Sequence, residues 1–258
     1  MAQAFSLFAP RPSALHRLHP LTKLSLAGFL FAAGLILPGA LTPYFVFLIF
    51  ALPLAALGKV TREWVAAAWR VTLPFAISVF LVQGFFWPRG TPLVFLGPLS
   101  LKSEGLVFAT TSTGRILVVV GSFLLLALTT RPDMLMRALT QSGLPGSIAY
   151  IIVATIQIVP RFQAKAAAIL DAQRARGLET EGNLVQRLRA ILPLVVPLVL
   201  GSLVDVEERA IAIEARAFNR PGPKTSLIEI TEAAWEPLLR WVIVGAMVGM
   251  VGLSVWLR

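Results

Sequence analysis

Two short stretches of the sequence repeat one pattern that suits a charged contact with another protein. Gln173-Arg174-Ala175-Arg176-Gly177-Leu178 is similar to Ile213-Glu214-Ala215-Arg216-Ala217-Phe218, and each places an arginine between two small residues. Small neighbours leave room for an approaching surface, and arginine offers a planar, permanently charged group to carboxylates or carbonyl oxygens. The sequence therefore predicts two docking motifs. Their members are Ala175, Arg176, Gly177, Ala215, Arg216 and Ala217, with Asp171 and Glu214 as supporting acidic residues.

Each motif lies at the C-terminal end of a charged, helix-forming stretch. In the first stretch, small residues recur at spacings of four, four and three, so we expect them to share one face and to let two helices cross closely. These residues are Ala164, Ala168, Ala172 and Ala175. Two crossed helices could present the two motifs to two similar partners. A pair of solvated helix ends with alanines by chance is the alternative that the residues alone leave open.

Other chemistry finds little support in the sequence. The chain has no cysteine and only two histidines, so no metal site and no histidine-based catalytic group are predicted. Gly58-Lys59 is followed by Val60, and Gly222-Pro223-Lys224-Thr225 has proline where a phosphate-binding loop needs glycine. We therefore expect no catalytic residue and no cofactor bound by this chain.

The composition identifies the class of protein. Of the 258 residues, 57% are apolar and 14% are charged, and the mean hydropathy is +0.78. These values exclude an ordinary soluble domain and a disordered chain. The net charge is +10, and in so apolar a chain it is more typical of positive-inside loops than of nucleic-acid binding. We therefore expect the chain to lie in a lipid bilayer, and no nucleic-acid partner is predicted.

Hydropathy predicts five membrane-spanning helices. Their ranges are Leu24–Ala40, Tyr44–Gly58, Val71–Trp87, Gly105–Leu128 and Trp241–Leu257, with a Gly/Pro-rich loop at Pro88–Ser100. Arg115 interrupts the fourth range, and a charged group inside a span usually has a partner or a path to water. In the alternative interpretation the span starts near Ile116 and Arg115 reaches the outer interface.

Residues 131–232 differ from the rest, because they alternate between apolar and charged helical stretches. Ten of the 23 lysines and arginines lie between Arg161 and Lys224. Two further spans here would place many of these cations outside the cell, against the positive-inside rule. We therefore predict an all-α polytopic membrane protein with three parts, 1–130 (four spans), 131–232 (cytoplasmic helices) and 233–258 (the last span), and with a cytoplasmic N-terminus.

The paired motifs resemble those of the transmembrane T component (EcfT) of energy-coupling-factor (ECF) ABC transporters. In that family two long cytoplasmic coupling helices each carry an Ala-Arg-Gly-like tripeptide. Residues 175–177 match it fully, and residues 215–217 end in alanine instead of glycine. Further matching stretches are His19-Pro20-Leu21-Thr22-Lys23-Leu24, Thr129-Thr130-Arg131-Pro132-Asp133, Ile158-Val159-Pro160 and Gln173, although His19 and Leu21 depart from the family pattern.

This resemblance implies an L-shaped protein in the prokaryotic inner membrane that works as a scaffold in an importer of a vitamin or a transition-metal ion. Arg176 and Arg216 would each dock into one of two ABC ATPase subunits, a homodimer or heterodimer that holds ATP and Mg. The coupling helices would pass the ATPase movement to a membrane substrate-binding S component. Candidate residues for contact with the S component are Met134, Ile152, Ile156, Leu192, Val196 and Leu200, and packing within the coupling helices is the alternative for each.

Two other classes of function have weaker support in the sequence. A self-contained permease that binds its own substrate would need ionisable groups at mid-membrane, and only Arg115 is available. An intramembrane protease with a Glu-Glu-x-x-x-Arg motif is disfavoured, because Glu207-Glu208 is followed by alanine at position 212.

Overall fold

The computed structural model describes residues 9, 11–88, 90–96, 99–178, 183–218, 220 and 230–256. The described residues of Ser6–Leu144 and Ile230–Arg258 form one compact unit, and those of Pro145–Glu229 form another. The helix α7 (Pro132–Gln141), which the sequence assigns to the part 131–232, packs against α2 (Pro20–Ile36) of the first unit.

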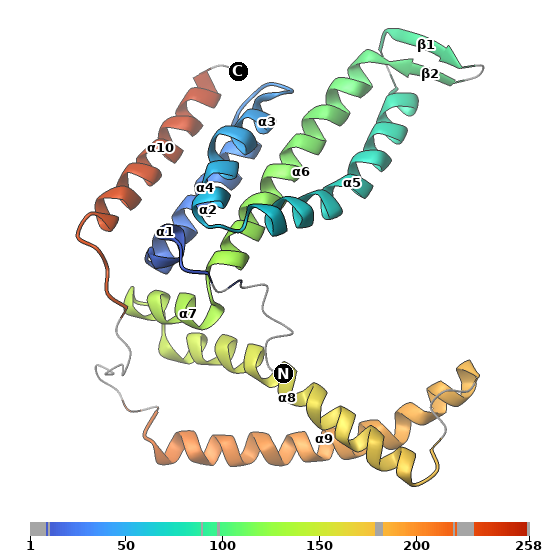
Figure 1. Ribbon diagram of the computed structural model, residues 1–258, viewed down its shortest axis with the longest axis vertical. Helices are drawn as coiled ribbons and strands as arrows, with labels where there is room; N and C mark the ends of the chain where they lie inside the picture. The colour runs from blue at the N-terminus through green and yellow to red at the C-terminus, as the bar shows by residue number, and fades with distance from the viewer. Residues whose placement is uncertain are drawn as a thin grey trace. The chain divides into compact units, whose positions relative to one another are not determined.

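The first unit is built around α6 (Ser103–Thr129), which packs against α2, α3 (Thr42–Val46) and α5 (Thr61–Phe86) (Figure 1). A π-helical turn (Phe47–Ala51) and α4 (Leu52–Leu57) continue α3. The short α1 (Ala14–Arg17) precedes α2, and α10 (Glu236–Trp256) packs against α2. Proline at the first position of α2 and α7 suits a helix start, because the amide that it lacks would have no partner there.

Among the described residues, four helices are long and apolar enough to cross a membrane, namely Thr61–Phe86, Ser103–Thr129, Gly146–Ala175 and Glu236–Ser254. Three of them, Thr61–Phe86, Ser103–Thr129 and Glu236–Ser254, overlap predicted spans. The first two predicted spans correspond to shorter apolar helices, Pro20–Ile36 and Thr42–Leu57. Gly146–Ala175 was assigned to the cytoplasm from its cations, and that side of the membrane stays a prediction. The all-α polytopic class is confirmed.

One element of the first unit is not helical. β1 (Pro92–Leu96) and β2 (Leu99–Lys102) form an antiparallel hairpin between α5 and α6, where the sequence predicted an irregular loop. The leucine-rich segments Leu93–Leu96 and Leu99–Leu101 flank Gly97-Pro98, a dipeptide that is typical of turns.

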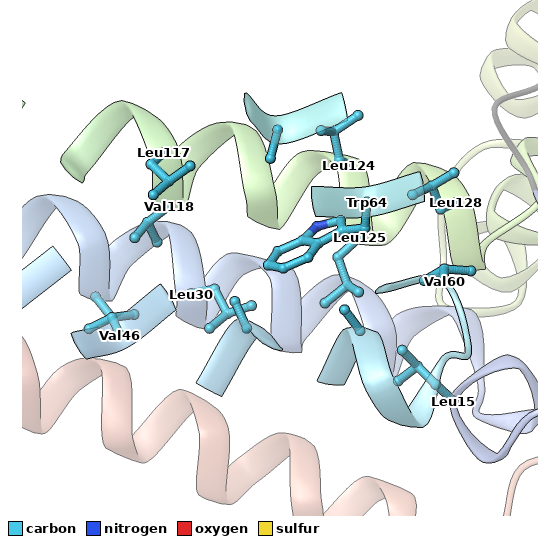
Figure 2. Packing of buried hydrophobic residues seen from close by; sticks show 14 residues of the cluster. Leu15, Leu30, Val46, Val60, Trp64, Leu117, Val118, Leu124, Leu125 and Leu128 are labelled. Carbon is cyan, nitrogen blue, oxygen red and sulfur yellow. The ribbon is translucent and has the colours of Figure 1, made fainter. Parts of the chain in front are cut away.

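The core of the first unit centres on Trp64, which is fully buried between α5 and α6 (Figure 2). Its Nε1 donates to the main-chain oxygen of Gly121 at 2.7 Å, and its ring stacks on Phe47 with centroids 4.7 Å apart. Gly121 permits this contact, because a Cβ there would lie 3.0 Å from the indole. Leu30, Val118 and Leu125 belong to the same buried apolar cluster as Trp64.

The second unit consists of two long helices, α8 (Gly146–Ala175) and α9 (Leu184–Ala215). Each contains proline, Pro160 in α8 and both Pro193 and Pro197 in α9. The two helices pack against each other and cross (Figure 1). The second unit therefore positions both docking motifs.

Candidate functional site

The first docking motif closes α8. The helix ends at Ala175, the N–H of Gly177 donates to the main-chain oxygen of Arg174 at 2.9 Å, and the N–H of Leu178 donates to that of Gln173 at 3.0 Å. Gly177 has a φ of 90°, in the left-handed region that favours glycine. This pair of bonds is a Schellman cap, which satisfies carbonyl groups that a helix end leaves unpaired.

The second docking motif closes α9 in the same way. The N–H of Ala217 donates to the main-chain oxygen of Glu214 at 2.8 Å, and the N–H of Phe218 donates to that of Ile213 at 3.2 Å. Ala217 takes the left-handed position with a φ of 54°. The two motifs therefore share one backbone shape, with Arg176 and Arg216 in equivalent places just after the last helical residue.

The third residue of each motif has a conformational role, whereas the sequence suggested that only lack of bulk was needed. A Cβ added at Gly177 would meet nothing within 4 Å, so space is not the constraint. A left-handed φ costs a residue with a Cβ roughly 1–2 kcal/mol, and Ala217 bears this cost. α7 ends in the same cap, with Gly143 at φ 107°, but Ser142 stands where the motifs have arginine. The cap is therefore shared with α7, and the arginine is what sets both motifs apart from the end of α7.

Both motif arginines are exposed. Within the part of the chain that the structure describes, neither the Arg176 nor the Arg216 guanidinium forms a hydrogen bond or an ion pair. Arg131 provides the contrast, because its guanidinium holds both carboxylate oxygens of Asp133 at 3.1 and 3.0 Å. Two exposed guanidinium groups with all their donors unused are suited to an external acceptor surface.

The two predicted supporting acids do not contact the motif arginines in the described residues. Asp171 lies 3.9 Å from Nη1 of Arg174, one turn along the same helix. Glu214 supports its motif through the main chain, since its carbonyl oxygen accepts the Ala217 N–H, and its side chain is exposed. Asp171 and Glu214 thus contact atoms of their own helix end.

Three hydrogen bonds and one ring contact join α8 to α9 and to the residues just after it, and they set the two helices antiparallel. Lys165 Nζ donates to the main-chain oxygen of Gly201 at 2.8 Å and to Oδ2 of Asp205 at 2.7 Å. Farther along α8, Gln173 Nε2 donates to the main-chain oxygen of Pro193 at 3.4 Å. Near the start of α8, the ring of Tyr150 lies 5.3 Å from that of Phe218, which follows the second motif.

The alanine stripe of α8 does not form the crossing, contrary to expectation. All four of its residues are exposed, and the contacts come from the neighbouring stripe that contains Lys165 and Gln173. Sequence analysis missed Lys165, Gly201 and Asp205. The available signal was the spacing of four that relates Pro197, Gly201 and Asp205 along one face of α9.

The two motifs lie far apart on the crossed pair. In the first motif, Arg176 lies three residues beyond Gln173, which contacts Pro193 of α9. The second motif begins at Ala215, the last residue of α9. At a rise of ~1.5 Å per residue, Pro193 and Ala215 are about 33 Å apart. The C-terminal ends of α8 and α9 accordingly lie on opposite sides of the crossing (Figure 1).

Arg115 lies at the centre of α6 and belongs to the first unit, so it is not part of either motif. The helix α6 begins at Ser103 and continues through Arg115 to Thr129, and the interpretation in which the membrane-spanning part starts near Ile116 stays a prediction. The Arg115 Nε is buried and has no hydrogen-bond partner among the described residues.

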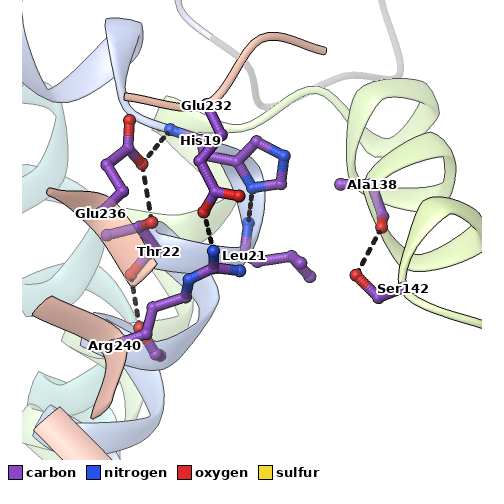
Figure 3. Close-up of polar contacts among 9 residues, drawn as sticks. His19, Leu21, Thr22, Ala138, Ser142, Glu232, Glu236 and Arg240 are labelled. Carbon is purple, nitrogen blue, oxygen red and sulfur yellow. Dashed lines mark hydrogen bonds and ion pairs between the residues drawn. The ribbon is translucent and has the colours of Figure 1, made fainter. Parts of the chain in front are cut away.

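Polar contacts also join the start of α2 to α10 in the first unit (Figure 3). Glu236, which is 3% exposed, accepts bonds from the His19 N–H at 2.8 Å and from Oγ1 of Thr22 at 2.7 Å. Arg240, which lies one helical turn after Glu236, forms an ion pair with Glu232. Burial lowers the pKa of His19 below its usual value, and the nearby Arg240 charge adds to this shift.

Lys23 connects two of the stretches that matched the family pattern. Its ammonium donates to the main-chain oxygens of His16 at 2.9 Å and Thr129 at 3.0 Å. The start of α2 and the end of α6 are thereby joined, so these matching residues have a structural role in the first unit.

Comparisons with known proteins place the chain among transport proteins. The family model described as CbiQ, cobalt transport protein, matches residues 12–227. An energy-coupling factor transporter transmembrane protein EcfT of Listeria innocua is 29% identical over 97% of this chain and 96% of its own length. The EcfT of Thermosediminibacter oceani is 26% identical over 86% and 87% of the two chains. A Bifidobacterium longum protein that carries the name of an ABC transporter ATP-binding protein is 31% identical over 90% of this chain, but over only 31% of its own length.

Proposed function

The chain belongs to the CbiQ family of cobalt transport proteins and is the energy-coupling transmembrane subunit of an ECF transporter, and from this premise we propose that Arg176 and Arg216 dock two ABC ATPase subunits. The observation that carries the proposal is the pair of identical helix-end caps, each with an exposed arginine that makes no contact in the described residues. Two equivalent sites suit two equivalent or related subunits.

The separation of the motifs supports one ATPase subunit at each. A distance of about 33 Å along α9 exceeds the ~8–10 Å between packed helices several-fold, so one small groove cannot hold both arginines. The Bifidobacterium longum relative supports ABC ATPase partners in another way, because its name is that of an ATP-binding protein while this chain matches about a third of it.

In this proposal the chain is a non-catalytic subunit that transmits movement. ATP and Mg would bind to the partner subunits, because neither Gly58-Lys59-Val60 nor Gly222-Pro223-Lys224-Thr225 has the glycines that cradle phosphates. Closure of the ATPase dimer would change the distance between Arg176 and Arg216, and the crossed helices would follow.

A membrane S component would receive that movement on the apolar faces of α8 and α9. Ile152, Ile156, Val196 and Leu200 are all exposed large apolar residues of the second unit, and exposed apolar surface on this scale suits a protein partner or lipid. Met134 is half-buried in the first unit, and the side chain of Leu192 lies outside the described residues. The S component would select the cargo, a vitamin or a transition-metal ion.

The proposed location is the prokaryotic inner membrane, with the N-terminus and the α8–α9 unit in the cytoplasm. The cations between Arg161 and Lys224 support this orientation. A cysteine introduced at Asn183 would report the side directly, because the chain has no native cysteine. We expect no labelling by an impermeant thiol reagent added to intact cells.

The docking proposal is tested with an R176E/R216E double variant. We expect it to lose co-purification with the ATPase subunits while it still accumulates in membranes, because each acidic residue repels the surface that receives arginine. An R161E/R209E double variant makes the same charge change in the same two helices outside the motifs and should retain the ATPases. Unchanged ATPase binding by R176E/R216E would disprove the docking role.

A further inference from the structure

We propose that Lys165 is a positioning residue that holds α8 and α9 together at a fixed point, about which the two helices turn when the ATPase subunits move. The inference rests on the proposed function only for the source of that movement. The fixed point itself follows from the contacts of Lys165 with Gly201 and Asp205.

The ammonium group of Lys165 bonds two acceptors that lie one helical turn apart on α9. Its distances are 2.8 Å to the Gly201 oxygen and 2.7 Å to Oδ2 of Asp205. The Lys165 side chain is 34% exposed and that of Asp205 is 57% exposed, so the ion pair is open to solvent, whereas the bond to the Gly201 oxygen is partly buried. Both distances are shorter than the 3.4 Å between Gln173 Nε2 and the main-chain oxygen of Pro193.

Lysine suits a point about which helices turn. An ammonium is a compact charge whose three donors rotate freely, whereas the planar guanidinium of arginine fixes the direction of its bonds. Lys165 can therefore keep both acceptors while the angle between α8 and α9 changes. A guanidinium would hold the helices together but would resist a change of angle.

Gly201 makes this contact possible. A Cβ at position 201 would lie 2.8 Å from Nζ and 2.9 Å from Cε of Lys165, so any side chain there has to displace the lysine. The absence of a side chain at Gly201 lets the end of the lysine lie against the α9 backbone. A Gly201→Ala substitution should thus shift this flexible end and weaken the Lys165 contact without changing a charge.

The test follows the two helices with spin labels in the complete transporter, purified through a tag on this chain. Cysteines introduced by Ala168→Cys and Ile211→Cys carry the labels, and both positions are exposed. With native Lys165, we expect ATP and vanadate to shift one narrow distribution of label distances. With Lys165→Met, we expect ATP hydrolysis to stay within about twofold and the nucleotide-dependent shift to fall by at least about half, because loss of the fixed point removes coupling between the sites.

Matched variants separate positioning from simple structural support. Gly201→Ala should reduce the shift in the same direction as Lys165→Met but by less, whereas Gly245→Ala should leave the shift unchanged, because a Cβ at position 245 meets nothing within 4 Å. Lys165→Arg should recover the narrow distribution with a smaller shift. Asp205→Asn, which keeps an acceptor, provides a milder variant if Lys165→Met fails to accumulate, and it should give an intermediate shift.

The proposal is overturned if Lys165→Met keeps the native shift, or if its ATP hydrolysis falls in proportion to the shift. Loss of ATPase co-purification in Lys165→Met and Asp205→Asn would overturn it too, because the residue would then support docking. Failure of the docking proposal can be told apart from failure of this one. It would appear as ATPase binding by R176E/R216E, whatever distance shift the Lys165 variants show.

Discussion

Gln173 donates from Nε2 to the main-chain oxygen of Pro193 across 3.4 Å. Inside α9 that oxygen would accept the amide of residue 197, but Pro197 has no N–H to donate. A fully buried carbonyl without a partner costs about 1–3 kcal/mol; Pro193 is half-buried, so the cost here is smaller, and the Gln173 amide offsets part of it. The proline that interrupts the α9 hydrogen bonds thus creates an acceptor for α8.

The first prediction concerns this pair. Gln173→Ala should raise amide exchange around Pro193 by an amount that corresponds to about 1 kcal/mol. In a protein that also carries Pro197→Ala, Gln173→Ala should lower the local stability less, because the new N–H at position 197 donates to the Pro193 oxygen. Hydrogen–deuterium exchange of α8 and α9 peptides in the four variants measures the difference. Equal costs in both backgrounds would contradict the assignment.

The second prediction concerns the two caps. Gly177→Ala should destabilise the end of α8 by roughly 1 kcal/mol, and Ala217→Gly should stabilise the end of α9 by a similar amount, because only the left-handed φ is at stake. Amide exchange at the last turn of each helix should therefore change in opposite directions. Changes in the same direction would mean that bulk, rather than φ, decides the third position.

The third prediction concerns the contact between α5 and α6. A Cβ at Gly105 would lie 2.0 Å from the main-chain oxygen of Gln83, which cannot move without separating the helices. Gly105→Ala should cost about 1–3 kcal/mol and lower the unfolding temperature in detergent. Gly28→Ala is the control in α2, where a Cβ meets nothing within 4 Å, and it should leave that temperature unchanged or raise it slightly.

The fourth prediction concerns pH. The neutral His19 ring accepts the Leu21 N–H at Nδ1, 3.3 Å away, and burial lowers its pKa from 6.5. The unfolded chain therefore binds this proton more readily, so the contribution of His19 to stability is present above about pH 6.5 and is lost as pH falls below that value.

The variant His19→Asn separates this effect from the rest of the protein. Asparagine is an effective helix-capping acceptor and does not titrate. The unfolding temperature of His19→Asn should thus fall less between about pH 7.5 and about pH 5 than that of the native chain. Burial also lowers the pKa of His16, so part of the fall should persist. Identical falls in both proteins would exclude His19 as the source.

Patterns local to the sequence predicted much of the fold. Helical stretches ending at the two motifs are present as α8 and α9. The helix around Val71–Trp87 begins ten residues earlier, at Thr61, because hydropathy reports the apolar part of a helix and not its start. Arg62, Glu63 and Arg70 lower the hydropathy of this segment, although Trp64 within it is fully buried.

Contacts between distant residues could not be predicted in the same way. The Lys165–Asp205 pair joins residues 40 apart, and no periodic pattern indicates which charged side chains meet. Glu236 is similar, because its bonds to His19 and Thr22 cross almost the whole chain. The two Ala-Arg-small motifs lie at helix ends, as the sequence predicts, but the left-handed φ of the third residue needed backbone geometry.

The close packing of α5 on α6 has a consequence for how the protein is made. These helices contact at both ends, through Trp64 with Gly121 and through Gln83 with Gly105, and a short hairpin joins them. We expect the pair to leave the insertion machinery together as one helical hairpin. Arg115, at the centre of α6, would then enter the bilayer beside a protein surface, where a charged group is less costly than in lipid.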